Sequence, residues 1–376
     1  MEKKKILVFH QWLAPYRIDQ FNTLNKLYDL EVTFLFDNLV YDKFDQQSLL
    51  SQCNFKVSYL LKGPQSKSRV FRYGIYKKIK KTQSDIILSY EYSFTTQYLI
   101  LLKSLGLINQ KLGSLVDDSL DICYHSRSKV RYLARKIALK KLDYLVLLSK
   151  DVAQYYKDKF KFKEDQVIIS PILQLPEKLR KDESGLENIA KGYLQKYNLK
   201  GKKVLLFVGR LAPEKALPQF LISIHKILLE NEVLQFIMIG EGKEMDVLKS
   251  IVEEKGLSNQ VKFAGKYEAQ ELHAWYLCGS GLVLPSISET FGAVVNEALI
   301  FGLKCLCSHL AGASSLITPT NGIIFNPLDD ADVKVKMNLF LDEMKPVENI
   351  SLTDVPCIMP NHPNDYLREL EKMNIT

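Results

Sequence analysis

The sequence predicts an α/β protein with two doubly wound, mostly parallel sheets in two Rossmann-like domains. Apolar runs of strand length alternate with helical stretches along the chain, which is typical of parallel sheets covered by helices. The alternation occurs twice, on either side of a polar segment with two prolines at residues 171–201. With 376 residues, the chain is long enough for two ordinary domains.

Each set of elements can be followed in order. The strands of the first set are ILVFH, EVTFLFD, FKVSYLL, DIILSY, KLGSLVDD, YLVLLS and QVIIS, with helical stretches such as RIDQFNTLNKLY and KVRYLARKIALKKL between them. The second set is VLLFVG, LQFIMIG, VKFAG, GLVLPS, LKCLCS and GIIFNP. We therefore expect an N-terminal domain over 1–172, a linker over 173–201 and a C-terminal domain over 202–361.

Composition excludes several classes of protein. No apolar run approaches the ~18 residues of a membrane-spanning helix, and the apolar part of the N-terminal MEKKKILVFH is too short for a signal peptide. Six scattered cysteines indicate reduced core thiols in a cytoplasmic protein. The GEG at 240–242 is not a dinucleotide fingerprint, so we expect no nicotinamide cofactor.

The stretch PSISETFGAVVNEALIFG carries two carboxylates, Glu289 and Glu297, between an apolar strand and a helical run. Glu289 is expected at the mouth of the strand-to-helix turn, beside backbone N–H groups that a helix leaves unpaired. Glu297 lies roughly two turns further along the helix, near the same face. This spacing suits a ligand with hydroxyls at two ends and phosphates between them, such as a nucleotide sugar.

Three further segments accompany this stretch in a fixed order. Arg210 and Lys215 follow the strand VLLFVG, Glu241 follows FIMIG, and HLAGASSLI precedes NGIIFNP. Over about residues 190–328 the chain resembles the retaining nucleotide-sugar glycosyltransferases of family 4, the "group 1" family. The resemblance implies the GT-B fold, in which two Rossmann-like domains face each other across a cleft. It also implies that a C-terminal helix, at about 362–376, packs back on the first domain.

The resemblance implies roles on the donor side. Arg210 and Lys215 would neutralise the donor diphosphate as it leaves, Glu289 would contact the sugar hydroxyls, and Glu297 the ribose. The remaining donor-binding residues would line the same pocket: Gly209, Glu241, Phe291, Gly292 and Ala293. No Asp-x-Asp motif is present, so we expect no metal. Ala216 and Asn296 depart from the family, which has glycine and an apolar residue there.

The acceptor side is less well defined by sequence. WLAPYRIDQ resembles a branch of the family with Pro-Tyr-Arg after the first strand, which would place Tyr16 and Arg17 in the cleft. The alternative is a helix that starts at the proline and leaves the arginine exposed. Asp118 and Glu91 each follow a strand and are candidates for contacting the acceptor or donor sugar, with Asp118 preferred as catalytic.

Charge is unevenly distributed along the chain. Residues 1–172 hold 29 Lys and Arg against 17 Asp and Glu, a net charge of +12, whereas the rest of the chain is net acidic. Lys62–Lys81 contains eight basic residues and Arg127–Lys141 seven, with no acid in either cluster. Aromatic residues are interleaved with them: Phe71, Tyr73, Tyr76 and Tyr132. An anionic membrane face would attract such clusters at ~1 kcal/mol per residue; a solvated helix face is the alternative.

The sequence thus predicts a metal-independent, retaining glycosyltransferase of the hexosyltransferase type. It would move a sugar from a nucleotide-sugar donor to a saccharide acceptor, lipid-linked and part of surface polysaccharide assembly. The protein would be cytoplasmic and peripheral on the inner membrane face, and no nucleic-acid motif accompanies the basic clusters. A nucleotide-sugar epimerase of the same fold and a noncatalytic sugar-nucleotide- or lipid-binding module are the alternatives.

Overall fold

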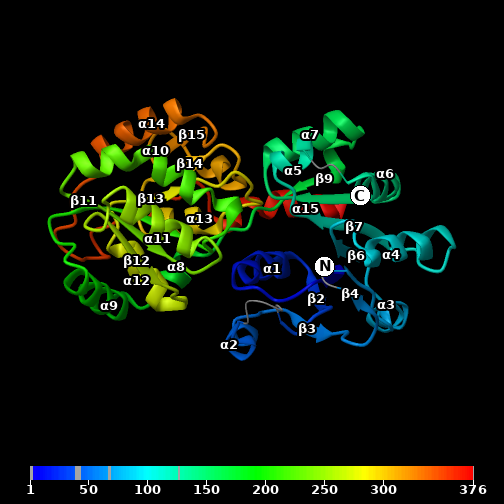
Figure 1. Cartoon of the computed structure of the whole chain (residues 1–376). Coiled ribbons are helices and arrows are strands. Elements are labelled where there is room, and N and C mark those ends of the chain that lie inside the picture. Colours follow the sequence, from blue (N-terminus) through cyan, green and yellow to red (C-terminus); the bar gives the residue numbers. More distant parts are fainter. Residues whose placement is uncertain (1–2, 39–43, 67–68, 126–127, 376) are drawn as a thin grey trace. The chain divides into compact units, whose positions relative to one another are not determined.

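The structure is a computed structural model that describes residues 3–38, 44–66, 69–125 and 128–375. The chain forms two compact units: unit 1 comprises residues 1–173 and 362–376, and unit 2 comprises residues 174–361. Each unit is an α/β layer structure around its own parallel sheet (Figure 1). Lys67 and Arg127, members of the two basic clusters, lie outside the described residues.

Unit 1 contains a seven-stranded sheet in the order β3-β2-β1-β6-β7-β8-β9. All neighbours in it are parallel. Its strands are β1 (Lys5–His10), β2 (Asp29–Phe34), β3 (Lys56–Tyr59), β6 (Ile86–Tyr90), β7 (Lys111–Val116), β8 (Tyr144–Leu147) and β9 (Val167–Ile169), and β4 (Gln65–Ser66) and β5 (Arg69–Val70) form a separate small pair. Chain order reverses at β1, so the topological switch point lies between β1 and β6.

Helices cover both faces of this sheet and bury one apolar cluster against each face. They are α1 (Pro15–Leu27), α2 (Gln46–Ser51), α3 (Ile75–Thr82), α4 (Phe94–Ser104), α5 (Leu120–His125), α6 (Lys129–Leu139), α7 (Lys150–Phe160) and α15 (Leu367–Ile375). Serines begin three of them, because Ser93, Ser128 and Ser149 each accept a hydrogen bond from the first turn of α4, α6 and α7.

The C-terminal helix α15 belongs to unit 1, although about 190 residues of chain separate it from the rest of that unit. It packs against α1 and β9, and in Figure 1 it is the red helix beside β9. Leu370 and Met373 are buried in the unit 1 core, and the Tyr28 hydroxyl donates to the Leu370 carbonyl at 2.7 Å. The helix is therefore part of the apolar core on one face of the sheet.

Unit 2 contains a six-stranded parallel sheet in the order β12-β11-β10-β13-β14-β15. Its strands are β10 (Lys203–Val208), β11 (Leu234–Ile239), β12 (Val261–Gly265), β13 (Gly281–Leu284), β14 (Cys305–Ser308) and β15 (Gly322–Phe325). Its helices include α10 (Leu217–Glu230), α11 (Met245–Glu254), α12 (Ala269–Leu277), α13 (Ala293–Ile300) and α14 (Asp330–Glu343). The switch point of this sheet lies between β10 and β13.

Most of the segment expected to be a linker is folded into unit 2. Residues 176–196 contain α8 (Pro176–Leu179) and α9 (Glu183–Lys196). Leu186 and Ala190 of α9 are buried, and the Tyr193 ring stacks on Trp275 of α12 with centroids 4.5 Å apart. The segment is polar because most residues of α9 lie on its exposed side. Its few apolar residues are spaced at helical intervals and pack against the rest of unit 2.

The predicted α/β class, with two doubly wound parallel sheets, is confirmed. That the two units face each other across a cleft stays a prediction. In the described part of the chain, no helix is both long and apolar enough to span a bilayer.

Candidate functional site

In unit 2 the candidate donor site lies at the sheet's switch point. The loop after β10 carries Arg210 and Lys215, and the loop after β13 carries Glu289 before α13 begins at Ala293. β10 and β13 are parallel neighbours, so both loops leave the same edge of the sheet. The crevice beyond the carboxyl ends of the strands at a switch point is where open α/β sheets bind ligands.

Lys215 and Glu289 form an ion pair across these two loops, with both side chains largely buried. A backbone hydrogen bond also joins the two loops: the Glu214 carbonyl accepts from the N–H of Ile287 at 3.0 Å. The structure therefore brings together a cation and a carboxylate that lie 74 positions apart in sequence. An ammonium group suits phosphate oxygens, and a carboxylate suits sugar hydroxyls.

Glycines bring the backbones of the β10 and β11 loops close together. Gly209 and Gly240 both have positive φ, and a side chain at Gly240 would collide with the carbonyl of Gly209. Gly242 approaches the carbonyl of Leu211 in the same way. The Glu241 carbonyl accepts from the Leu211 N–H at 2.9 Å, and the Glu241 side chain is exposed.

The N-terminus of α13 lies next to Glu289 in the chain. Gly292, with φ of +92°, is its N-cap residue, Ala293 begins the helix, and Phe291 is buried. No side chain caps this end, and the Val295 N–H donates to the Gly292 carbonyl at 3.0 Å. The positive end of the helix dipole favours an anion there.

Glu297 is buried on α13 and already has partners within the unit. The Tyr276 hydroxyl donates to Glu297 Oε2 at 2.7 Å, and the side chain of Gln174 also bonds to it. Burial raises the pKa of the Glu297 carboxyl to about 7. A role with ribose hydroxyls stays a prediction, and a ligand there would have to share a carboxyl that Tyr276 holds.

Arg210 is not part of the Lys215–Glu289 pair. Its side chain is mostly exposed and bonds to Glu214, four residues on, at 3.1 Å. Ala216, where the family has glycine, does require a left-handed backbone, with φ of +50°. Asn296, the other departure, is buried and accepts from the backbone N–H of Gln174 at 2.8 Å.

In unit 1 the candidate acceptor residues gather at the carboxyl edge of the sheet. They follow β1, β6 and β7, which are successive neighbours. Arg17, near the start of α1, is buried and forms an ion pair with Asp117 and a 2.6 Å hydrogen bond to Gln20. Tyr16 beside it is half-buried. Arg17 is thus an internal partner of Asp117 rather than an exposed helix-start arginine.

Glu91 occupies a constrained turn directly after β6, with φ of +54°. Three hydrogen bonds fix its backbone: its N–H donates to Leu115, and its carbonyl accepts from the hydroxyls of Thr96 and Ser114. A glutamate in the left-handed region persists only where surrounding contacts impose it, and such turns concentrate at functional sites. The carboxyl accepts from the Asp117 N–H at 3.0 Å.

Burial, and then the nearby Asp118 and Asp117, raise the pKa of Glu91 to about 8. The Arg131 guanidinium on α6 lies 3.2 Å from both Glu91 and Asp118 and partly offsets this shift. Arg131 therefore connects α6 to the edge of the sheet. The side chain of Glu91 remains about a fifth exposed, so one side of this cluster is open.

Asp118 lies fully inside unit 1, which differs from the preferred catalytic role. Its carboxylate accepts from Arg135 at 2.5 Å, from the Tyr156 hydroxyl at 2.6 Å and from Arg131. With no exposed side-chain surface and three donors around it, Asp118 anchors this cluster and offers no face to a substrate. The reason is local: of the two residues that follow β7, Asp117 pairs with Arg17 of α1, whereas Asp118 pairs with Arg135 of α6.

Arg131, Arg135 and Tyr156 were not predicted from the sequence as members of this cluster. Two arginines spaced i, i+4 on α6 were an available signal, because that spacing places both on one face. In the described part of the chain, no three His, Cys, Asp or Glu side chains are grouped so that they could hold a metal ion.

Residues 192–351 match the family model described as glycosyl transferases group 1. They include the Lys215–Glu289 pair and the α13 N-terminus. This part of the chain is a group 1 glycosyltransferase domain. Membership of group 1 is thereby confirmed for this part of the chain, whereas retention and family 4 stay predictions. The residues at the switch point lie within the matched range.

Curated relatives of the glycosyltransferase domain are named as transferases of different sugars. The chain is 29% identical over 183 residues to a 2-deoxystreptamine N-acetyl-D-glucosaminyltransferase of Niallia circulans, and the aligned region covers 46% of each chain. It is 23% identical over 163 residues to an alpha-D-kanosaminyltransferase of Streptomyces kanamyceticus, covering 43% of this chain and 42% of that one. The match thus spans less than half the length of these relatives.

Solved glycosyltransferase structures share the fold of the whole chain. The structure of Anabaena Alr3699/HepE in complex with UDP and glucose has a TM-score of 0.69 at 16% identity, covering 99% of this chain and 100% of that one. The lipopolysaccharide outer core galactosyltransferase WaaB, in its apo form, has a TM-score of 0.67 at 16% identity, with the same coverage. At these identities the likeness establishes the fold alone, and the predicted two-domain GT-B fold is confirmed in its two α/β units.

Proposed function

We propose that this protein is a retaining hexosyltransferase that moves a sugar from a nucleotide-sugar donor to a saccharide acceptor. The observation that carries the proposal is the Lys215–Glu289 pair at the switch point of the group 1 domain. The ammonium group is suited to the donor diphosphate and the carboxylate to hydroxyls of the transferred sugar. The complex of the similar Anabaena protein with UDP and glucose makes uridine nucleotides the first donors to try.

In the proposed reaction, the bond between the anomeric carbon and the diphosphate oxygen breaks. The oxygen of the acceptor hydroxyl bonds to that carbon on the same face, and the hydroxyl proton passes, through Glu91 or directly, to the leaving diphosphate. Negative charge grows on the diphosphate as it leaves, and Lys215, Arg210 and the N-terminus of α13 would stabilise it. Arg210 would have to leave Glu214, a surface pair that costs little to break. With these cations available, the proposed chemistry proceeds without a metal.

We place the acceptor against the open side of Glu91 in unit 1. A carboxyl with a pKa of about 8 exchanges protons near neutral pH, as a group that binds or deprotonates a hydroxyl should. Arg17 and Asp118 would hold this arrangement in place through their internal ion pairs. The proposed acceptor is a lipid-linked saccharide in surface polysaccharide assembly, reached from the cytoplasmic face of the membrane.

The net charge of unit 1 supports a peripheral place on an anionic leaflet. Not all of the basic residues are free to contribute. Arg72 is buried and donates to the Leu35 carbonyl, Lys78 pairs with Glu31, and Arg131 and Arg135 pair with Asp118. The cationic surface is thus narrower than the two clusters of the sequence, and consists of the exposed lysines among them.

A two-step experiment tests the proposal. A panel of nucleotide sugars is first screened by thermal shift, since a ligand at about 100 times its Kd adds about 2.7 kcal/mol to stability. The donor that binds is then incubated with lipid-linked and free saccharides, and the anomeric proton of the product is followed by NMR. Transfer with the donor's own anomeric configuration supports the proposal. An epimerised donor without an acceptor would indicate the epimerase, and binding without any turnover the noncatalytic module.

A further inference from the structure

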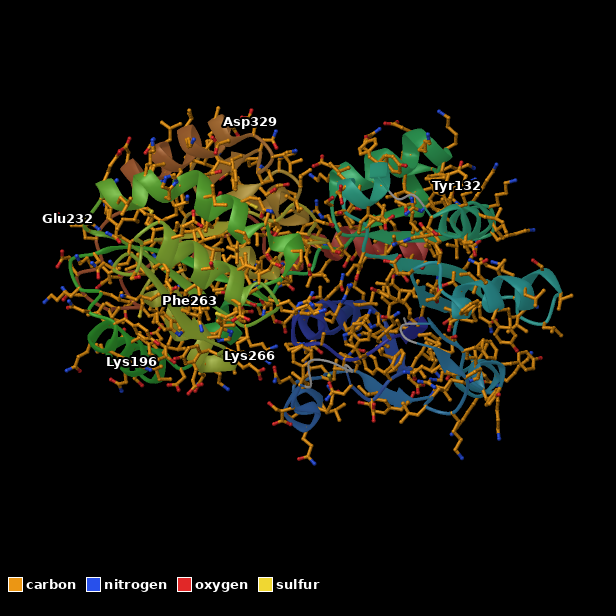
Figure 2. The ribbon with its side chains drawn as sticks, viewed as in Figure 1. Tyr132, Lys196, Glu232, Phe263, Lys266 and Asp329 are labelled. Atoms are coloured by element: carbon orange, nitrogen blue, oxygen red, sulfur yellow. The ribbon has the colours of Figure 1, made fainter. Side chains whose placement is uncertain are left out.

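Large apolar side chains are exposed in a row on α6 of unit 1. Val130, Leu133 and Ile137 are 74%, 57% and 46% exposed. Their spacing of three and four residues places them on one face of the helix. Tyr132, labelled in Figure 2, is also exposed on this helix. Exposed apolar side chains that form a contiguous row mark an interaction site, whereas single ones need no explanation.

The row on α6 continues onto α4, the helix packed beside it. The Gln97 side chain of α4 donates to the Ala134 carbonyl of α6. The side of α4 that carries Gln97 therefore faces α6. Phe94 and Leu101 flank Gln97 at three and four residues and are both about half exposed. The two rows thus border the same junction, and we call them together the α4–α6 apolar face: Phe94, Leu101, Val130, Leu133 and Ile137.

Lysines form the next row on α6. Lys129, Lys136 and Lys140 are exposed, and their spacing of seven and four residues places them on one side of the helix. No acidic residue lies between Ser128 and Leu142. The inner side of the same helix carries Arg131 and Arg135, which bond to Asp118. The outer surface of α6 is therefore apolar on one half and cationic on the other.

We propose that α6, with the adjoining surface of α4, docks unit 1 on the surface of an anionic lipid bilayer. Apolar side chains would enter the boundary between headgroups and acyl chains, and the lysines would lie among the anionic headgroups. A second copy of this chain does not suit the surface, because a symmetric contact would bring the lysine rows of the two copies together.

Two other surfaces combine these properties less fully. On α3, Lys77, Lys80 and Lys81 are exposed, but the helix buries its apolar residues Ile75 and Ile79. On α14 of unit 2, Val335 and Leu339 are 56% and 49% exposed, but the neighbouring Lys334 pairs with Asp330, and the acids Asp342 and Glu343 end the helix. Only charge and apolar area together predict a bilayer contact, so these two surfaces serve as matched controls.

The inference deepens the proposed function, and rests on it for the lipid-linked acceptor. Arg131 lies on the docking helix and reaches Glu91 with its guanidinium. A bilayer held against the outer side of α6 would place the headgroup region one helix away from the open side of Glu91. A lipid-linked saccharide could then reach that carboxyl while its lipid stays in the leaflet.

Vesicle co-sedimentation of the full-length chain tests the inference. The vesicles contain phosphatidylcholine alone, or phosphatidylcholine and phosphatidylglycerol in equal parts. We expect binding to the anionic vesicles that weakens with salt. The partition coefficient onto anionic vesicles should be at least about tenfold lower for a Val130→Ser/Leu133→Ser/Ile137→Ser variant. It should be about a hundredfold lower for a Lys129→Gln/Lys136→Gln/Lys140→Gln variant. Val335→Ser/Leu339→Ser should bind like the wild type, and Lys77→Gln/Lys80→Gln/Lys81→Gln should lose clearly less affinity than the α6 lysine variant.

Several outcomes would overturn the inference. They are equal binding by the α6 serine variant and the wild type, equal binding of the wild type to both kinds of vesicle, and no binding to either. A dimer in sedimentation velocity that the α6 serine variant abolishes would assign the face to a second copy instead. Nucleotide-sugar binding, measured on the same samples, keeps the two proposals apart, because unit 2 can bind donor whether or not α6 binds lipid.

Discussion

Lys215 and Glu289 form an ion pair between the loops that follow β10 and β13, two neighbouring strands at the switch point of the unit 2 sheet. In the absence of donor, each of these charges neutralises the other. A nucleotide sugar that offers phosphate oxygens to Lys215 and hydroxyls to Glu289 can replace the pair without leaving either charge uncompensated. The pair therefore keeps two partly buried charges in position for the proposed donor.

The first prediction concerns the phosphate clamp. Lys215→Ala should lower kcat/KM for transfer about 10²-fold or more, because a cation that stabilises the leaving diphosphate is lost. Arg210→Ala should lower it on the same scale if Arg210 moves onto the diphosphate. Initial rates at saturating acceptor give both values. Lys334→Ala, which breaks an exposed pair with Asp330 in the same unit, is the control and should leave the rate unchanged. Near-wild-type rates in both the Lys215 and Arg210 variants would remove the clamp.

The second prediction concerns Ala216, which adopts φ of +50° immediately after Lys215. A left-handed backbone costs an alanine about 1–2 kcal/mol, and the greater freedom of glycine in the unfolded chain offsets part of the gain. Ala216→Gly should therefore stabilise unit 2 by about 0.5–1 kcal/mol. Urea unfolding followed by Trp275 fluorescence in a Trp12→Phe background measures it. Ala212→Gly, at an extended residue, should destabilise; a stabilisation of equal size there would contradict the explanation.

The third prediction concerns pH and Glu91, whose pKa is raised to about 8 by burial and by Asp118 and Asp117. The folded state then holds a proton that the unfolded state has lost, so the free energy of unfolding falls as the pH rises between the two pKa values. The contribution of Glu91 is fully present below the unfolded pKa of about 4.3 and is lost as the pH rises through about 8.

Glu91→Gln removes this titration. Unfolding of unit 1 can be followed by Trp12 fluorescence in a Trp275→Phe background. Between about pH 5 and pH 9 the free energy of unfolding should fall in both chains, and the fall should be smaller in Glu91→Gln by on the order of 2–4 kcal/mol. The difference between the two chains cancels the other titrating groups. Parallel pH profiles for wild type and variant would show that Glu91 titrates normally.

The fourth prediction separates the anchoring role of Asp118 from a catalytic one. Asp118→Asn leaves the buried Arg135 without its counter-charge, which should cost about 3–5 kcal/mol of unfolding free energy in unit 1. Asp151→Asn, at an exposed position on α7, should change stability by less than about 0.5 kcal/mol. A catalytic Asp118 would instead show a large loss of kcat with stability intact, measured on the same variant.

The sequence predicted much of the fold and the loops that carry the candidate donor residues, for physical reasons. Strands buried on both faces must be apolar runs, so the order of sheet and helix is legible from the chain. Lys215 and Glu289 were found because each follows such a strand, and strand ends at a switch point meet. The sequence could not predict that they form an ion pair. The two residues lie 74 positions apart, and their contact depends on which strands are neighbours in the sheet.

The acceptor side was less predictable because its contacts depend on side-chain direction. Asp117 and Asp118 are adjacent, yet one pairs with Arg17 at the sheet edge and the other is sealed inside with Arg135. A one-residue shift decides between a partly buried carboxylate and a fully buried one, and no pattern in the sequence distinguishes the two. The polar segment 173–201 was misread for a related reason, because α9 buries only a narrow apolar side.

The most direct test of the central claim is calorimetric titration of the full-length protein with UDP, GDP, ADP and CDP in the presence of EDTA. The account predicts saturable binding of one of these diphosphates without metal, weakened about tenfold or more by Lys215→Ala and unchanged by Lys334→Ala. Absence of binding by all four, binding that requires an added divalent metal, or equal affinity in the wild type and Lys215→Ala would contradict it.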